Sequence, residues 1–157
     1  IEYIDDLYRE HGYYKNVQYL VELPGKSGRS VMEATMLHLR DNPPTLLAGT
    51  PVTGISDLLN ESPSKPGSYS MGSSKDVVTL YLSYDRRTRI TVRPSGTEPK
   101  LKIYLQHRAD VEDNLDTIKA QVDMVTANLG EAILEHCSSR LPEALRLEWD
   151  CSTHRVI

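Results

Sequence analysis

The sequence predicts an α+β fold in which a mainly antiparallel, four-stranded sheet is covered by helices on one face. Apolar and polar residues alternate in several short stretches, which is the period of a half-buried strand. The last three of these stretches follow one another after short connections, an arrangement typical of an antiparallel meander. Helical spacing after the first and after the last strand then predicts helices packed against the sheet.

The first twelve residues predict the end of a helix. Ile4, Leu7 and Tyr8 are spaced as one apolar side of an amphipathic helix, and Gly12 follows where a glycine commonly ends one. The chain begins with isoleucine rather than methionine, in the middle of this pattern. We therefore expect a piece of a longer protein, with residues 1–12 as the tail of the preceding domain's last helix.

A strand, a helix and a weaker strand are expected next. Residues 16–23 alternate in polarity, and a Pro-Gly pair ends that strand. Residues 27–40 carry an apolar side at helical spacing, and the two prolines within 41–44 end the helix. Residues 46–55 are a second strand candidate, which a glycine and a proline restrict to the edge of the sheet.

The clearest strand pattern follows a long polar segment. Residues 60–75 contain almost no large apolar side chain and predict an exposed, mobile loop. The three strands of the predicted meander come after it, with a turn between the first two and a loop between the last two. They cover residues 77–83, 89–93 and 100–106.

A long helix is expected after the meander, with Asp110 as its N-cap. An apolar residue recurs every three or four positions, which predicts one continuous buried side. Gly130 is a candidate break before a second helical segment, and residues 140–157 have too weak a pattern to be placed. The apolar side consists of Val111, Leu115, Ile118, Val122, Val125 and Leu129.

The composition excludes several classes of function. The net charge of -4 provides no general basic field for nucleic acid or an anionic membrane. No apolar run approaches the length of a membrane-spanning helix, and no signal peptide is visible. The thiols of Cys137 and Cys151 lack metal-ligand spacing and indicate a reducing, cytoplasmic location. No catalytic or metal-binding role is assigned to His11, His38, His107, His136 or His154.

The loop between the last two predicted strands carries the chemistry. From Arg93 to Lys100 it reads RPSGTEPK, and its two prolines stiffen the shoulders of a tight connection. Gly96 permits backbone conformations that turn successive N–H groups into one concavity. Ser95 and Thr97 add hydroxyl groups, and Arg93 adds a planar fork of donors suited to phosphate.

The strand alternation puts Arg93, Lys100 and Lys102 on one face of the sheet. If the strands pair around the loop, Arg93 and Lys100 lie near each other across the turn. Like charges that face each other are destabilising, and a bound dianion would relieve the repulsion. These residues alone leave two interpretations open, an anion site or a polar hairpin with solvated charges.

The motif RPSGTEPK resembles the phosphate-binding loop of the α-D-phosphohexomutases, the phosphoglucomutase/phosphomannomutase family. Its flanks agree with that family, with Ile90-Thr91-Val92 entering the loop and Leu101-Lys102-Ile103-Tyr104 leaving it. The segment from Asp6 to Tyr14 resembles the end of the family's third domain. The resemblance covers roughly residues 1–130.

The resemblance implies a domain division and a fold. Residues 13–135 would form the family's C-terminal, fourth domain, with a TATA-binding-protein-like sheet, and residues 136–157 would be a C-terminal extension. The partners implied are a sugar phosphate and the other three domains of the same chain, with neither nucleic acid nor membrane among them.

The resemblance also implies an activity. Family members move phosphate between the C1 and C6 (or C5) positions of a sugar through a phosphoserine enzyme, with Mg2+ at the phosphoserine and a sugar bisphosphate as intermediate and activator. The family's serine loop and Asp-rich metal loop are absent from these 157 residues. We therefore expect no catalytic and no metal-binding residue here, and no activity of the fragment alone. The substrate phosphate would contact Arg93, Ser95, Gly96, Thr97 and Lys102.

Two other functions stay open at this point. The chain could be a stand-alone module that binds phosphorylated ligands, or a protein-interaction domain without catalysis. Glucose, mannose and pentose phosphates all remain open as substrates, with glucose favoured by the branch that the opening segment resembles. Contact of Lys100 with phosphate is equally open, whereas Glu98 is not expected to touch phosphate because like charges repel.

Overall fold

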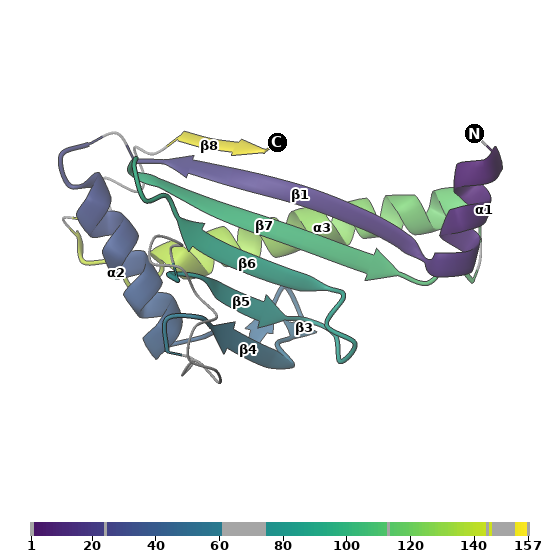
Figure 1. Cartoon of the computed structure of the whole chain (residues 1–157), viewed down its shortest axis with the longest axis horizontal. Helices are drawn as coiled ribbons and strands as arrows, with labels where there is room; N and C mark the ends of the chain where they lie inside the picture. Colours follow the sequence, from purple (N-terminus) through teal and green to yellow (C-terminus); the bar gives the residue numbers. More distant parts are fainter. Residues whose placement is uncertain are drawn as a thin grey trace, which may run out of the picture.

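The computed structural model describes residues 2–23, 25–60, 75–112, 114–143, 145 and 153–156. The predicted mobile loop 60–75 therefore lies almost entirely outside the described residues. Three helices are present in the described part of the chain, and Figure 1 shows their arrangement around the sheet. They are α1 (Glu2–His11), α2 (Gly28–Asp41) and α3 (Leu115–Ser138).

The main sheet is antiparallel, as predicted, but it has six strands rather than four. Its order is β4-β5-β6-β7-β1-β8, so the predicted meander β5-β6-β7 forms the centre and β1 returns to pair with β7. The two additional strands, β4 and β8, lie at the edges, where a short segment needs only one partner. The bounds are β1 Tyr13–Glu22, β4 Gly54–Asp57, β5 Val78–Tyr81, β6 Arg89–Pro94, β7 Lys100–Ala109 and β8 Thr153–Val156.

The predicted edge strand 46–55 is divided into shorter pieces. Strands β2 (Leu46–Leu47) and β3 (Thr50–Pro51) form a separate two-stranded hairpin. Ala48 and Gly49 both have positive φ, 47° and 80°, which is the backbone of a tight hairpin turn. The chain then reaches the edge of the main sheet only at β4.

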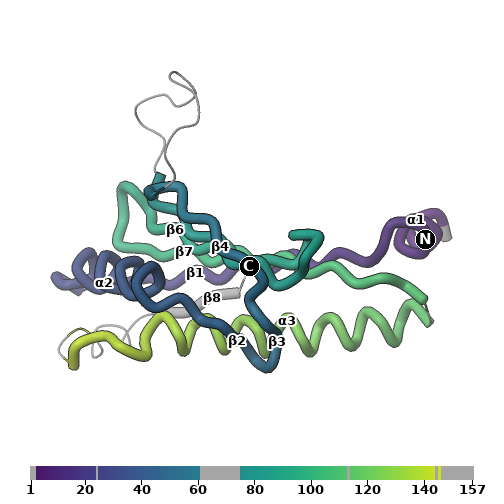
Figure 2. The backbone as a smooth tube through the Cα atoms, turned by 90° about the horizontal axis from the view of Figure 1, so that it is seen from below, coloured from purple at the N-terminus to yellow at the C-terminus, as the bar shows by residue number. Residues whose placement is uncertain are grey.

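Helices α2 and α3 cover one face of the sheet, which confirms the predicted layering (Figure 2). Apolar residues of the central strands alternate in burial with polar ones, so one face of each strand enters the core. The opposite, outer face carries the polar residues. The fully buried core side chains include Val21, Leu80, Ile90, Val92, Ile103 and Leu105 of the strands and Val31, Met36, Leu39, Leu129 and Ile133 of the helices.

The N-cap of α3 is Asn114 rather than the predicted Asp110. The Asn114 side-chain oxygen accepts hydrogen bonds from the N–H groups of Asp116 at 2.9 Å and Thr117 at 3.3 Å. Strand β7 continues to Ala109, so Asp110 lies directly at its end, where it bonds to Arg108 instead.

Gly130 does not break α3, contrary to the prediction, because the helix continues to Ser138. A Cβ atom added at Gly130 would lie 2.0 Å from the Tyr19 hydroxyl oxygen and 2.3 Å from the ring carbon that bears it. The glycine is thus needed for the close packing of β1 against α3. By contrast, Gly12 does end α1 as predicted, with φ +90° and its N–H donating to the Tyr8 carbonyl at 2.9 Å.

Candidate phosphate-binding site

The candidate site lies at the connection between β6 and β7. The Ser95 N–H donates to the Lys100 carbonyl at 2.8 Å, and the Lys100 N–H donates to the Glu98 carbonyl at 2.8 Å. A third bond, from the Leu23 N–H to the Pro99 carbonyl at 2.9 Å, ties the connection to the end of β1. The loop is therefore closed at its base by its own hydrogen bonds and tied to the end of β1 at Pro99.

The register of β6 and β7 brings Arg93 directly opposite Lys102. The expected neighbour of Arg93, Lys100, instead lies opposite Glu22 of β1. Its ammonium group is 2.9 Å from a Glu98 carboxylate oxygen and 3.5 Å from a Glu22 one. The hydrogen bond to Glu98 raises the pKa of Lys100 above its usual value. The prediction put Lys100 near Arg93. The residue directly opposite Arg93 is Lys102 instead, because the loop closes with Pro94 opposite Leu101.

Arg93 and Lys102 form a pair of facing cations on the outer face of the sheet. The Arg93 side chain is exposed and that of Lys102 is half-buried. Among the described residues, neither has a carboxylate partner or a side-chain hydrogen bond. Facing like charges cost free energy, so an anion between them would stabilise this arrangement.

The tip of the loop offers further donors. The Ser95 N–H is used within the loop, so Ser95 has only its hydroxyl to contribute. Within the described part of the chain, the N–H groups of Gly96, Thr97 and Glu98 make no hydrogen bond, and neither do the hydroxyls of Ser95 and Thr97. Successive free N–H groups in a tight loop are a common device for binding anions.

The backbone conformation of Gly96 is not the reason why this position holds a glycine, contrary to the expectation. Its φ is not among the positive values, so the loop does not require the left-handed conformation there. An added Cβ would meet no atom within 4 Å, so the fold does not require the small side chain either. The glycine leaves the loop backbone accessible on its open side, where a ligand can approach the N–H groups closely.

His38, His107 and His136 contact other parts of the fold. The ring of His107 packs against α3, with Nδ1 3.1 Å from the Thr126 hydroxyl, and burial lowers its pKa. The rings of His38 and His136 stack with their centres 5.0 Å apart. Cys137 is buried, and burial raises the pKa of its thiol to about 12. The described residues contain no cluster of three or more His, Cys, Asp or Glu that could hold a metal ion.

Two features of the structure were not predicted from the sequence. Arg40 of α2 bonds to both Asp57 and Asp76, residues that flank the segment between β4 and β5. A hollow also crosses the outer face of four strands. Both features bring together residues that are far apart in the chain. For the hollow, the sequence shows only that each strand has a polar side.

No helix in the described ranges is long and apolar enough to cross a membrane.

The segment that contains this loop matches known proteins. Residues 76–125, which include β5, β6, the loop and β7, match the family model described as phosphoglucomutase/phosphomannomutase, C-terminal domain. This match defines the class of the domain. The chain belongs to the phosphoglucomutase/phosphomannomutase family and contains the C-terminal domain of that family.

Individual relatives extend the similarity beyond the loop. A phosphoglucomutase of Staphylococcus aureus strain N315 is 32% identical over 123 residues, which cover 76% of this chain and 22% of that protein. A phosphoglucomutase of Staphylococcus saprophyticus is 31% identical over 134 residues, and a probable phosphomannomutase of Haemophilus influenzae is 29% identical over 122 residues. Each of these two alignments covers 78% of this chain and 22% of the relative. The chain therefore spans about a fifth of the length of the relatives it matches.

Proposed function

We propose that this chain is the substrate-phosphate-binding domain of a phosphoglucomutase or phosphomannomutase. The full-length enzyme would move phosphate between the C1 and C6 (or C5) positions of a sugar, through a phosphoserine enzyme and a sugar-bisphosphate intermediate. One observation carries the proposal. Arg93 faces Lys102 at the base of the loop that carries the free N–H groups of residues 96–98, and no carboxylate in the described residues neutralises the two cations.

The domain would act by binding and orienting, without proton transfer. Charge-assisted hydrogen bonds contribute about 1.5–3 kcal/mol each, and the Arg93 fork, Lys102 and the loop donors of Ser95, Gly96 and Thr97 provide several. Binding energy from the phosphate that does not react would hold the reactive end of the sugar in position. Glucose or mannose phosphates are the substrates proposed, in line with the names of the relatives.

The remaining machinery of the mutase is proposed to lie outside these residues. The proposal assigns Mg2+ and the phosphoserine to other domains of the full-length enzyme, and the described residues contain no cluster of three or more His, Cys, Asp or Glu. The 157-residue chain would then bind phosphate in the cytoplasm as part of a larger enzyme and would catalyse nothing alone.

A titration of the 15N-labelled chain with inorganic phosphate tests the proposal. Because the dianion would sit at the loop, we expect the amide signals of Gly96 and Thr97 to move and saturate. Arg93→Gln should abolish most of this movement without changing the fold. Arg87→Gln is the matched control, since Arg87 is an exposed arginine two residues before the start of β6, at the end far from the loop. Loop signals that stay fixed at high phosphate, or that move equally in Arg93→Gln, would rule the proposal out.

A further inference from the structure

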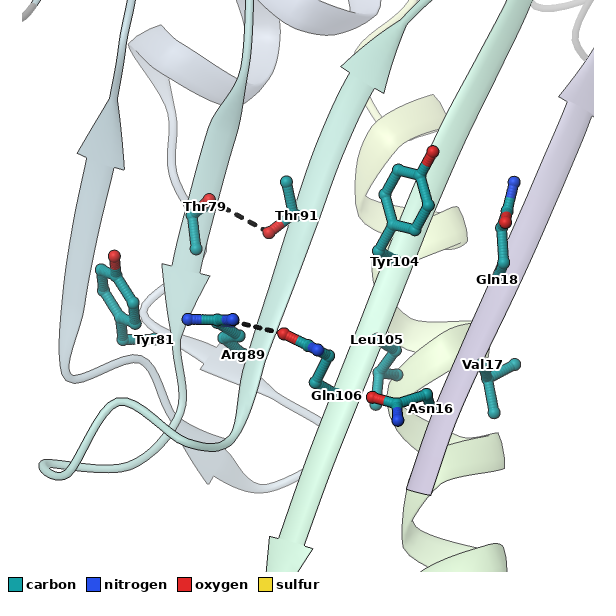
Figure 3. Close-up of a pocket in the computed structure, with 10 residues that line it drawn as sticks. All are labelled: Asn16, Val17, Gln18, Thr79, Tyr81, Arg89, Thr91, Tyr104, Leu105 and Gln106. Carbon is teal, nitrogen blue, oxygen red and sulfur yellow. Dashed lines mark hydrogen bonds between the residues drawn. The ribbon is translucent and has the colours of Figure 1, made fainter. Parts of the chain in front are cut away.

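A hollow crosses the middle of the outer sheet face, on β5, β6, β7 and β1. Its volume is about 490 Å3, and Figure 3 shows the side chains that line it. This volume is within the usual range of small-molecule sites, about 300–1,000 Å3. The polar side chains that carry the argument are those of Gln18, Tyr81, Arg89, Thr91, Tyr104 and Gln106.

The hollow is separate from the phosphate loop, although it lies on the same face. Thr91 is opposite Tyr104, one row below the Arg93–Lys102 pair, and Arg89 is opposite Gln106, one row further. Successive rows on one face are about 7 Å apart, so Arg89 lies about 14 Å from the pair. Neither Arg93 nor Lys102 lines the hollow.

The charge in the hollow selects for an anion. Arg89 uses its Nε–H to bond the Gln106 side-chain oxygen at 2.5 Å, and the other guanidinium donors remain available (Figure 3). No Asp or Glu lines the hollow, and within the described chain no carboxylate forms an ion pair with Arg89. Nearby arginines differ in this respect, since Arg87 has Asp85 at 3.9 Å and Arg108 bonds to Asp110.

The neutral groups of the hollow suit a ring with several hydroxyls. In the described structure, the Tyr104 hydroxyl and the Gln18 side-chain amide make no hydrogen bond. Strands β7 and β1 therefore each offer free donors and acceptors to a ligand in the hollow. Thr79 and Thr91 bond to each other at 3.1 Å and close the opposite side. Tyr81 carries the Arg86 guanidinium 4.9 Å from its ring centre, which fixes the ring at the rim.

We propose that this hollow is a second ligand site, for a hydroxyl-rich ring that bears one anionic group, such as a sugar acid or a sugar monophosphate. Arg89 anchors the anion, and Tyr104, Gln18 and Gln106 contact the hydroxyls. An outer sheet face that only meets water needs no concavity of this size and no unpaired arginine at its centre. The site does not depend on the phosphate loop.

The test compares four probes on the 15N-labelled chain: glucuronate, glucose 6-phosphate, glucose and inorganic phosphate. We expect an anionic sugar to move the amide signals of Arg89, Thr91, Tyr104 and Gln106, also in the Arg93→Gln variant. Movement by glucuronate identifies a carboxylate ligand, and movement by glucose 6-phosphate alone identifies a phosphorylated one. Equal affinity for neutral glucose would overturn the role of Arg89.

Variants locate the site. Arg89→Gln should weaken binding of the effective probe about tenfold, as expected for the loss of one charge-assisted contact, whereas Arg87→Gln should leave it unchanged. Tyr104→Phe removes a single hydroxyl and serves as a second test if Arg89→Gln does not fold. Failure of all four probes to move hollow signals, or movement that disappears in Arg93→Gln, would refute the second site and leave the loop proposal unaffected.

Discussion

Replacement of Gly130 by alanine probes the packing of β1 on α3. In the folded chain, the new Cβ would lie 2.0 Å from the Tyr19 hydroxyl oxygen and 2.8 Å from a further ring carbon. Ordinary contacts of this kind begin near 3.4 Å, so the ring has to shift by more than an ångström. Tyr19 is only 8% exposed and belongs to the core, so its neighbours have to move with it.

The magnitude follows from two opposing effects. Overpacking a core by one methyl group costs about 1–3 kcal/mol, whereas alanine in place of glycine inside a helix gains about 1 kcal/mol. Because a contact of 2.0 Å puts the overpacking cost in the upper part of that range, about 2–3 kcal/mol, we expect a net loss of about 1–2 kcal/mol in the free energy of unfolding. For a domain of this size, that loss corresponds to a fall in melting temperature of roughly 2–8 °C.

Denaturant unfolding followed by circular dichroism measures this loss. Gly96→Ala is the control, because its Cβ meets no atom within 4 Å and its stability should stay within about 0.5 kcal/mol of the unchanged chain. In a Tyr19→Leu background the cost of Gly130→Ala should shrink, with a coupling of about 0.5–3 kcal/mol between the two sites. An equal cost in both backgrounds, or no cost in either, would refute the assigned contact.

Two further predictions concern ion pairing and pH. Arg40→Ala leaves Asp57 and Asp76 without their shared partner. Because the Arg40 side chain is only 12% exposed, the free energy of unfolding should fall by roughly 3 kcal/mol. A chemical unfolding curve like that of the unchanged chain would argue against this contribution of Arg40. Burial lowers the folded-state pKa values of His107 and His136 below the usual 6.5, so the unfolded chain binds these protons more tightly. The stability that depends on these two groups should therefore be fully present above about pH 6.5 and fall as the pH drops through that value. His107→Gln should reduce the loss of unfolding free energy measured between pH 7.5 and 5.5. An identical loss in both chains would contradict the role of His107.

Strong periodicity made most of the fold predictable. The central strands, α2 and α3 all have a clear apolar side, and the structure has each of them within a few residues of its expected position. Short edge strands were not predictable in this way. β4 and β8 have four residues each, and their place depends on an open edge of the sheet rather than on their own pattern.

Single-residue roles were harder to predict, because they depend on tertiary contacts. Gly130 has the sequence signal of a helix break, but its actual constraint is the ring of Tyr19, more than one hundred residues earlier in the chain. Asp110 has the chemistry of an N-cap, yet the length of β7 moves that role to Asn114.

The candidate site shows the same division. The residues of the loop were identifiable from its motif, whereas the partner of Arg93 depends on the strand register. In the observed register the residue opposite Arg93 is Lys102 rather than Lys100, and Lys100 forms ion pairs with Glu22 and Glu98. The hollow around Arg89 comes from four strands and could not be found in any one of them.

The most direct test is the melting temperature of the chain and of its Arg93→Gln/Lys102→Gln variant, each with and without inorganic phosphate. A ligand that binds the folded state alone raises stability by RT ln(1 + [L]/Kd), so the gain grows as the ligand concentration exceeds the dissociation constant. If the two facing cations bind the dianion, phosphate will raise the melting temperature of the unchanged chain and leave that of the variant where it is. An equal rise in both chains, or none in either, would contradict the proposed site.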